Sequence, residues 1–443
     1  MRISPRSARI WVSSRPRQSP SAFRSSWTGT RAIARREAAE MRILHLSSLY
    51  PPYVLGGAER VVEMLAEGQA REGHEVGVAY LSPGPDPAGD RNGVKTFPIA
   101  NPNLFWIEDI PSKPAPLRVA NKALTIVNPR STAAFGRIVE EWRPDVVHSH
   151  SMVIFSPMAW ARAKSAGARL VHTLHDYDMV CLKATLFKGG HNCGKAHAAC
   201  DYSSRWKARY APLFDAVVGV SQAVLAEHVE RGALKGVSPD RRSVIWNGVA
   251  LEKASFSERR ERNGPLTFGF MGRLMPEKGL DTLLAACRLL PAEGWRLRIA
   301  GKARGDVDYQ ALAAGLPVEF CGFVEPGAFL DSLDVLAVPP VWREPFGLTV
   351  VEALARGVPV LGSDNGAVGE LVEKSGLGRD WVVPAGNPAA LAARMRGLID
   401  GRRAALPFPA SYGDLLDAVA PGKMVRSYLS LYEHVLSERM AAE

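Results

Sequence analysis

The stretch that most constrains this chain is DVLAVPPVWREPFGLTVVEALARGVPVLGSD, residues 334–364. Apolar runs at 335–338 and 358–361 enclose a loop at 341–345 and an amphipathic segment at 346–356. This order predicts a strand, a loop, a helix and a second strand. Loops that lead from a strand to a helix lie at the ligand-binding edge of α/β sheets, so we expect ligand contacts in this loop.

Two carboxylates flank the beginning of the predicted helix. Glu344 lies in the loop and Glu352 lies further along the helix. Between them, the backbone amides near Phe346, Gly347 and Leu348 would form a helix N-terminus, which favours a phosphate through unpaired N–H groups and the helix dipole. The element therefore combines an anion seat with two acceptors that suit sugar hydroxyls.

The same alternation of strand-like and helix-like segments fills two long blocks. The first is 41–249 and the second is 266–420, with a polar linker predicted at 250–265 and a final amphipathic helix within 421–443. Because 443 residues exceed what one hydrophobic core usually holds, two domains are expected. The alternation predicts an α/β protein with two doubly wound sheets.

Most of the positive charge lies in the first 40 residues. This stretch holds nine Arg and only two acids, so it carries +7 of the formal net charge of +10, and a nucleic-acid partner is not indicated. It lacks the apolar run of a secretory signal, although its Arg and Ser content resembles a transit peptide. We favour a start at Met41 and expect residues 1–40 to be a disordered or non-native leader.

Polar and glycine residues follow two predicted strands of the first block. Gly56 and Gly57 separate a strand from a helix, where they would serve a plain turn or a close backbone approach to a ligand. A full G-x-G-x-x-G is absent, which disfavours a nicotinamide dehydrogenase. His175 ends another strand, where open sheets place ligand contacts. Asp176 and Asp178 are spaced like a metal-binding D-x-D, but we do not assign a metal to them because the proteins that use that pair have a single-domain architecture.

An insertion at 179–210 interrupts the alternation. It contains Cys181, Cys193 and Cys200 together with two histidines, and these could supply a tetrahedral zinc site. No C-x-x-C pair is present, so an Ω-like loop with buried thiols is the alternative. Its basic residues would either face an anionic acceptor or simply be solvated. Five cysteines in so long a chain do not suggest a disulfide scaffold, and we expect a reducing compartment.

Residues 101–130 are predicted to be irregular. They carry Phe105, Trp106, Ile107 and Leu117 beside basic residues, which is compatible with a packed loop or with a contact to a membrane or a lipid-bearing acceptor. No apolar run reaches the roughly 18–20 residues that a membrane-spanning helix needs.

The second block begins with a strand that leads into GRLMPEKG, residues 272–279. Arg273 and Lys278 lie at this strand-to-helix junction. Two cations beside a helix N-terminus suit a pyrophosphate, whose negative charge grows as a leaving group departs.

Together these motifs resemble the retaining family 4 glycosyltransferases, over essentially all of residues 41–441. EPFGLTVVE, from Glu344 to Glu352, matches the family's E-x7-E motif, and the loop 272–279 matches its phosphate-binding loop. Weaker matches are the Gly56-Gly57 pair, DVVHSH at 145–150 and NGV at 247–249.

The resemblance implies the GT-B architecture, in which two Rossmann-like doubly wound domains face each other across a cleft. The nucleotide-diphosphate sugar would lie mainly on the second domain and the acceptor on the first, with the final helix crossing back to brace the first domain. The implied activity is a cytoplasmic hexosyltransferase of polysaccharide biosynthesis, with a saccharide or lipid-linked acceptor and a possible peripheral contact with the inner face of the membrane. No cofactor and no catalytic metal are implied.

The resemblance also assigns roles to residues. Arg273 and Lys278 would hold the pyrophosphate and stabilise the departing diphosphate. Glu352 would accept from the ribose hydroxyls, Glu344 would contact hydroxyls of the donor sugar, and His175 would lie near that sugar. The remaining donor-binding positions are Gly57, Gly272, Phe346, Gly347, Leu348 and Thr349.

Retention of configuration normally calls for a carboxylate nucleophile on the far face of the sugar, and no residue of this chain can be assigned to that role. Our hypothesis is a front-face route through an oxocarbenium-like ion pair, in which the leaving phosphate guides the acceptor hydroxyl. Alternatives are a catalytically inactive nucleotide-sugar-binding partner subunit and a GT-B epimerase, against which the E-x7-E motif argues. A phosphorylase would need a cofactor lysine site that is not found.

Overall fold

The computed structural model describes residues 40–250, 264–303, 307–401, 406 and 412–442. Residues 1–39 and 40–443 are separate units, and every element below belongs to the second unit. The predicted leader, apart from Glu40, and most of the predicted linker at 250–265 lie outside the described residues. Within the described part, no helix has both the length and the apolar character needed to cross a membrane.

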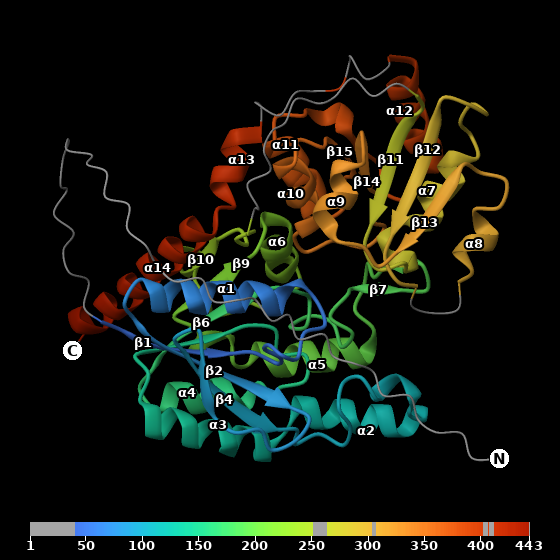
Figure 1. Ribbon diagram of the computed structural model, residues 1–443. Helices are drawn as coiled ribbons and strands as arrows, with labels where there is room; N and C mark the ends of the chain where they lie inside the picture. Colours follow the sequence, from blue (N-terminus) through green and yellow to red (C-terminus); the bar gives the residue numbers. More distant parts are fainter. Residues whose placement is uncertain (1–39, 251–263, 304–306, 402–405, 407–411, 443) are drawn as a thin grey trace, which may run out of the picture. The chain divides into compact units, whose positions relative to one another are not determined.

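The first sheet has eight strands, in the order β10-β9-β6-β5-β1-β2-β4-β3, and all neighbours are parallel except β3 and β4. Its strands are nearly continuous apolar runs, as expected where helices cover both faces of a parallel sheet. Figure 1 shows α1 and α14 over one face and α3 and α4 over the other. The strands are β1 Arg42–Leu46, β2 Glu75–Ser82, β3 Gly89–Arg91, β4 Val94–Ala100, β5 Val146–Ser149, β6 Arg169–Leu174, β9 Ala216–Gly219 and β10 Arg242–Val244. The helices are α1 Gly57–Arg71, α2 Ala115–Ile126, α3 Pro129–Trp142, α4 Met158–Ser165, α5 Ala198–Ala208 and α6 Gln222–Glu230.

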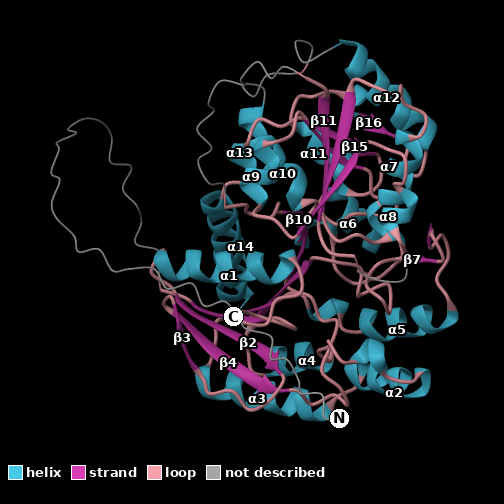
Figure 2. Cartoon of the chain, turned by 45° about the vertical axis from the view of Figure 1, so that its right-hand side comes forward, coloured by secondary structure: helices cyan, strands magenta, loops and turns pink. Residues whose placement is uncertain are grey.

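The second sheet has six parallel strands in the order β13-β12-β11-β14-β15-β16. Figure 2 shows α7, α8 and α12 on one side of this sheet and α9 and α10 on the other. The strands are β11 Leu266–Met271, β12 Trp295–Ala300, β13 Val318–Gly322, β14 Val335–Val338, β15 Val360–Ser363 and β16 Val382–Val383. The helices are α7 Leu280–Cys287, α8 Tyr309–Leu312, α9 Pro326–Asp331, α10 Leu348–Ala355, α11 Ala367–Lys374, α12 Pro388–Gly401, α13 Gly413–Ala418 and α14 Pro421–Ala442.

The order of the strands reverses at equivalent places in the two sheets. β1 pairs with both β2 and β5, and β11 pairs with both β12 and β14, so each sheet is wound outward in two directions from a central strand. This topology confirms the predicted α/β class with two Rossmann-like, doubly wound sheets. Such sheets bind ligands beyond the carboxyl ends of the strands where the winding reverses.

The long helix α14 packs on the first sheet (Figure 1, red beside the blue α1). The approach to α1 is so close that a Cβ on Gly68 would lie 2.4 Å from Val425 Cγ2. Tyr428 and Tyr432 of α14 are buried against apolar residues of α1 and of the sheet. Residues from near the end of the described chain therefore complete the core around β1 and β2.

One prediction of irregular structure is wrong. Residues 101–130 contain the helix α2, which begins after Pro114. Its apolar pattern is inverted: Asn121 and Thr125 are 2% and 3% exposed, whereas Leu117 and Val119 are 44% and 70% exposed. Helical periodicity is read from apolar residues that face a core, so this helix gave no such signal.

The structure also refines other expectations. The insertion at 179–210 contains α5 and a short hairpin, β7 Phe187–Lys188 with β8 His191–Asn192. α10 begins at Leu348, two residues after the predicted start, because Gly347 adopts a left-handed conformation with φ 93°.

Candidate active site

Strand-to-helix loops from both sheets line a cavity of about 480 Å³. Its walls come from the loops after β1, β5 and β6 in the first sheet and after β11 and β14 in the second. These include the two places where the winding of the sheets reverses, so the cavity lies where this fold class binds ligands. Ten of the eleven residues predicted for the site line it: Gly57, His175, Gly272, Arg273, Lys278, Glu344, Phe346, Gly347, Leu348 and Thr349.

Glu352 is the predicted site residue that does not line the cavity. It lies in α10, one turn beyond Leu348 and Thr349, and is half-buried. Burial raises the pKa of its carboxyl, while the charges of Arg60 and Arg356 act in the opposite direction.

The first residues of α10, Leu348 and Thr349, line the cavity. Gly347 precedes the helix and supplies no side-chain cap, so the first amides are not satisfied by a capping side chain. Gly57 from the first sheet's side approaches this terminus closely, because a Cβ on Gly57 would lie 2.3 Å from Leu348 Cδ1. A glycine at 57 therefore lets two loops meet at the predicted phosphate seat.

The loop after β11 brings Lys278 to Glu344. Lys278 Nζ lies 2.5 Å from Glu344 Oε2, and Trp342 Nε1 donates to the same oxygen at 3.0 Å. The ammonium also lies over the Trp342 ring, 5.0 Å from its centroid. Gly279 makes this turn possible, since its φ is 77° and a Cβ would lie 1.8 Å from Pro339 O. An incoming phosphate would thus compete with Glu344 for Lys278.

Arg273 is placed differently from Lys278. It is exposed, lines the cavity, and has no ion-pair partner among the described residues. Its guanidinium therefore stays available to an anion without breaking an existing pair.

The loop that carries Glu344 is held by residues of the first sheet's half. Asn192 Nδ2 donates to Val341 O at 2.7 Å, and the amide of Arg343 donates to Asn192 Oδ1 at 3.2 Å. Ser221 Oγ donates to Pro345 O at 2.7 Å. These bonds, two of them from the insertion's hairpin, fix the loop 341–345 from outside its own sheet.

His175 is buried at the carboxyl end of β6. Its Nε2 lies 3.0 Å from Nδ1 of His150, while its Nδ1 makes no hydrogen bond with any described residue. Burial lowers the pKa of His175 to about 3, so the ring is neutral at neutral pH.

Asp176 is a cavity residue that the sequence did not assign. Burial, followed by the nearby charge of Asp178, raises its pKa to about 7, and Ser151 Oγ donates to its Oδ2. Asp178 instead pairs with Lys207 Nζ at 3.1 Å. Burial acts to raise the pKa of Asp178, but the charge and hydrogen bond of Lys207, together with the nearby histidines, lower it below its ordinary value. The two carboxyls thus have separate partners, and the position of Asp176 directly after a strand end was the available signal.

The three cysteines suggested as zinc ligands form no disulfide, and Cys193 Sγ lies 3.9 Å from His197 Nε2. Burial, together with the neighbouring thiols of Cys181 and Cys193, raises the pKa of Cys200. Among the described residues, the group that brings three possible ligand atoms within 4.8 Å of one another is His45, His148 and His150.

Comparison with known proteins agrees with the geometry. A model described as Glycosyltransferase Family 4 matches residues 55–253, and one described as Glycosyl transferases group 1 matches residues 265–401. A 42.6 kDa protein in the cps region of Klebsiella pneumoniae is 28% identical over 338 residues, which cover 75% of this chain and 87% of that protein. The glycogen synthase of Mycobacterium tuberculosis is 30% identical over 390 residues, which cover 82% of this chain and 87% of the synthase. The crystal structure of HepE from Anabaena, solved with UDP, superposes with a TM-score of 0.64 at 20% identity and covers 89% of this chain and 100% of HepE.

Proposed function

The chain belongs to glycosyltransferase family 4, and from this premise we propose that it moves a hexosyl unit from a nucleotide-diphosphate sugar to a saccharide or lipid-linked acceptor, without a metal and with retention of configuration. The observation that carries the proposal is the cavity in which Arg273, Lys278, Glu344 and the N-terminus of α10 meet. This set combines two cations and free amides with an acceptor for hydroxyl groups.

The diphosphate would bind between the two cations and α10. Arg273 is free to pair with an anion, and Lys278 would turn from Glu344 toward the phosphate. As the bond to the sugar breaks, negative charge grows on the phosphate oxygen, and fixed cations stabilise that charge more than they stabilise the bound donor. The two side chains would thus serve in place of a divalent ion.

The sugar and the ribose would be held by the remaining polar residues. Glu344, once released from Lys278, would accept from hydroxyls of the donor sugar, with His175 close to the same sugar. Glu352 would accept from the ribose hydroxyls after a small movement that opens its position beside the cavity.

We keep the front-face route for the transfer step. The cavity carboxyls are Glu59, Asp176 and Glu344, and Glu344 is already paired with Lys278. With a pKa raised to about 7, Asp176 is partly ionised at neutral pH, and its carboxylate form would take up the proton of an acceptor hydroxyl.

A cytoplasmic location with peripheral membrane contact belongs to the same proposal. Leu117 and Val119 of α2 are exposed, and Arg118 lies between them in the sequence. An exposed apolar surface beside basic residues suits the interface of an anionic membrane, where a lipid-linked acceptor would be found.

The test is a transfer assay with the purified chain in EDTA. UDP-hexoses come first, because HepE was solved with UDP, followed by sugars on other nucleotides. We expect release of the nucleoside diphosphate that increases with a saccharide acceptor, and a product whose anomeric configuration by NMR is that of the donor.

The alternatives give different results in the same assay. A catalytically inactive partner subunit would bind a donor without releasing the diphosphate. An epimerase would convert the sugar without an acceptor. A product of inverted configuration, or activity that EDTA abolishes, would contradict retention or metal independence respectively.

A further inference from the structure

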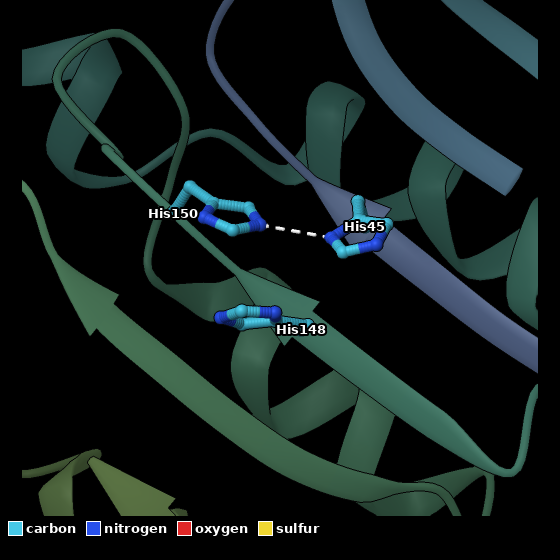
Figure 3. A group of neighbouring side chains, drawn as sticks. All are labelled: His45, His148 and His150. Carbon is cyan, nitrogen blue, oxygen red and sulfur yellow. Dashed lines mark hydrogen bonds between the residues drawn. The ribbon is translucent and has the colours of Figure 1, made fainter. Parts of the chain in front are cut away.

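A chain of buried hydrogen bonds runs from α1 to the cavity. Gln69 Oε1 lies 2.8 Å from His45 Nε2, and His45 Nδ1 lies 2.9 Å from His150 Nε2. His150 Nδ1 lies 3.0 Å from His175 Nε2, and His175 lines the cavity. Figure 3 shows the central step, in which His45 of β1 and His150 after β5 face each other beside His148.

The rings in this chain are neutral at neutral pH. Burial lowers the pKa of His45 to about 4 and that of His175 to about 3, and it holds the pKa of His150 well below its ordinary value. A neutral imidazole carries one N–H, so one nitrogen of each ring donates and the other accepts.

Because each ring has a single N–H, the donor of the first hydrogen bond determines the donor of every other hydrogen bond in the chain. The Gln69 oxygen can only accept, so His45 Nε2 carries the hydrogen and His45 Nδ1 is bare. His150 must then donate from Nε2 to His45, and its own Nδ1 is bare. His175 must donate from Nε2 to His150, which leaves His175 Nδ1 as a bare acceptor.

We propose that Gln69 is a positioning residue for this site: through His45 and His150 it fixes the tautomer of His175, so that Nδ1 is available to accept from a ligand hydroxyl. Two observations meet in this assignment, because the nitrogen that the relay leaves bare is also the one that is buried without a partner. That the hydroxyl belongs to a sugar rests on the proposed function.

A second arm of the network starts at the Gln69 amide group. Gln69 Nε2 donates to Tyr432 Oη at 3.3 Å, and Tyr432 in turn donates to His148 Nδ1 at 2.5 Å. His148 Nε2 then donates to Thr173 Oγ1 at 2.7 Å, and Thr173 is 3.0 Å from Tyr428 Oη. Both tyrosines come from α14, so the network joins this helix to α1.

The geometry favours this relay over a metal centre at the same histidines. A zinc ion lies about 2.0–2.1 Å from each nitrogen, which places tetrahedral ligand nitrogens roughly 3.3 Å apart. The nitrogens of His45 and His150 are 2.9 Å apart, as in a hydrogen bond. Both nitrogens of His148 are already taken by Tyr432 and Thr173.

The first measurement is a nitrogen NMR spectrum of the ligand-free chain with 15N-labelled histidine, in which His175 is assigned by its absence in His175→Gln. We expect an imine-type signal for His175 Nδ1 and a pyrrole-type signal for Nε2. The reverse pattern in the wild type would overturn the proposal without recourse to any variant.

The second measurement compares two variants. Gln69→Met removes the acceptor, so His175 should become a mixture of tautomers, and the KM for the donor should rise about two- to tenfold, as for one lost hydrogen bond, with kcat less affected. Tyr428→Phe is the matched control, because it alters only the far end of the second arm and should leave the His175 signals unchanged. Unchanged His175 signals in Gln69→Met would refute the role of Gln69.

Metal analysis of the purified chain completes the test. One equivalent of bound metal, with histidine signals that shift on chelation, would replace the relay with a metal site. The spectra need no donor, so a wild type that shows the expected tautomer but no transfer would leave the relay intact and refute the proposed function alone.

Discussion

Lys278 Nζ lies 2.5 Å from Glu344 Oε2, so the cation predicted for the phosphate and the carboxylate predicted for the sugar neutralise each other. The pair is largely buried and sits under the Trp342 ring, where a charge left without its partner is costly. A phosphate that attracts Lys278 would at the same time free Glu344. With the proposed roles, the pair would couple binding of the phosphate to release of Glu344 for the sugar.

Removing either cation should depress transfer severely. For Arg273→Ala and Lys278→Ala we expect kcat to fall by about 100- to 1,000-fold, as when a group that stabilises developing charge is deleted. The measurement is nucleotide release at saturating donor. Lys302→Ala is the control, since Lys302 is exposed after β12 and does not line the cavity. Near-normal turnover in either cation variant would refute the phosphate assignment.

Glu344→Gln should separate binding from turnover. Without the carboxylate, Lys278 is free for phosphate, so UDP should bind at least as tightly as in the wild type by calorimetry. The same change removes a strong acceptor for the sugar, so kcat should fall by roughly tenfold or more, about the effect of one charged hydrogen bond. Weaker UDP binding together with normal kcat would contradict the assigned division of roles.

The pKa of Asp176 predicts a pH dependence of the reaction. A carboxyl with a pKa of about 7 is protonated below that pH and ionised above it. If Asp176 takes up the acceptor proton, kcat/KM should rise with pH through about 7 and level off above it. Asp176→Asn should abolish the rise of kcat/KM with pH. Asp178→Asn is expected to lower stability instead, because Asp178 pairs with the buried Lys207. A wild-type profile that is flat from pH 6 to 8 would exclude the role.

The buried histidines predict loss of stability in mild acid. Their folded pKa values lie below the ordinary 6.5, at about 4 for His45 and about 3 for His175, because burial disfavours the charged ring. Between pH 6.5 and about 4 the unfolded chain therefore binds protons that the folded chain does not. The free energy of unfolding should fall as the pH drops through this window, by on the order of 1 kcal/mol per pH unit for each such histidine.

Urea titrations at several pH values would measure this slope. His45→Gln should reduce the slope, even if it lowers stability at every pH. His434→Gln is the matched control, because His434 is exposed on α14 and should leave the slope unchanged. Equal slopes in both variants would show that the histidine cluster is not the source.

Membrane contact through α2 can be tested by flotation with vesicles that contain an anionic lipid. Leu117→Asp combined with Val119→Asp should weaken binding roughly tenfold or more, because two exposed apolar side chains are lost from the interface. Val229→Asp is the control, since Val229 is also exposed but lies on α6. Transfer to a water-soluble acceptor should be unaffected, and equal flotation of both variants would refute the contact.

The parts of the site that the sequence predicted are local in the chain. GRLMPEKG and EPFGLTVVE each place a loop and a helix start within nine residues, so their strand-end position could be inferred from periodicity alone. The relay was out of reach because Gln69, His45, His150 and Tyr432 come from four separate elements. His45 lies in β1 and His150 directly follows β5, and the pairing of these strands, with His45 opposite His148, brings the histidines together.

Charge and burial account for the remaining differences. Asp176 and Asp178 were considered only as a metal-binding pair and set aside on architecture, and the sequence does not show that Lys207 pairs with Asp178 and leaves Asp176 at the cavity. The α2 helix was missed because its polar side chains face inward, where Asn121 accepts from the amide of Phe105. The state of the two carboxyls and the burial of α2 both depend on contacts with residues distant in the sequence, which a local sequence pattern does not show.

The hydrogen bonds from Asn192 and Ser221 to the loop 341–345 limit how chimeras of this chain can be designed. A chimera that keeps the first half of one relative and takes the second half of another would exchange the second sheet but lose the side chains that hold the loop 341–345, which carries Glu344. In such a hybrid both sheets would form, but the loop that carries Glu344 would be misplaced. Donor specificity should therefore be exchanged with three pieces rather than two: the second half, the hairpin that carries Asn192, and the start of α6.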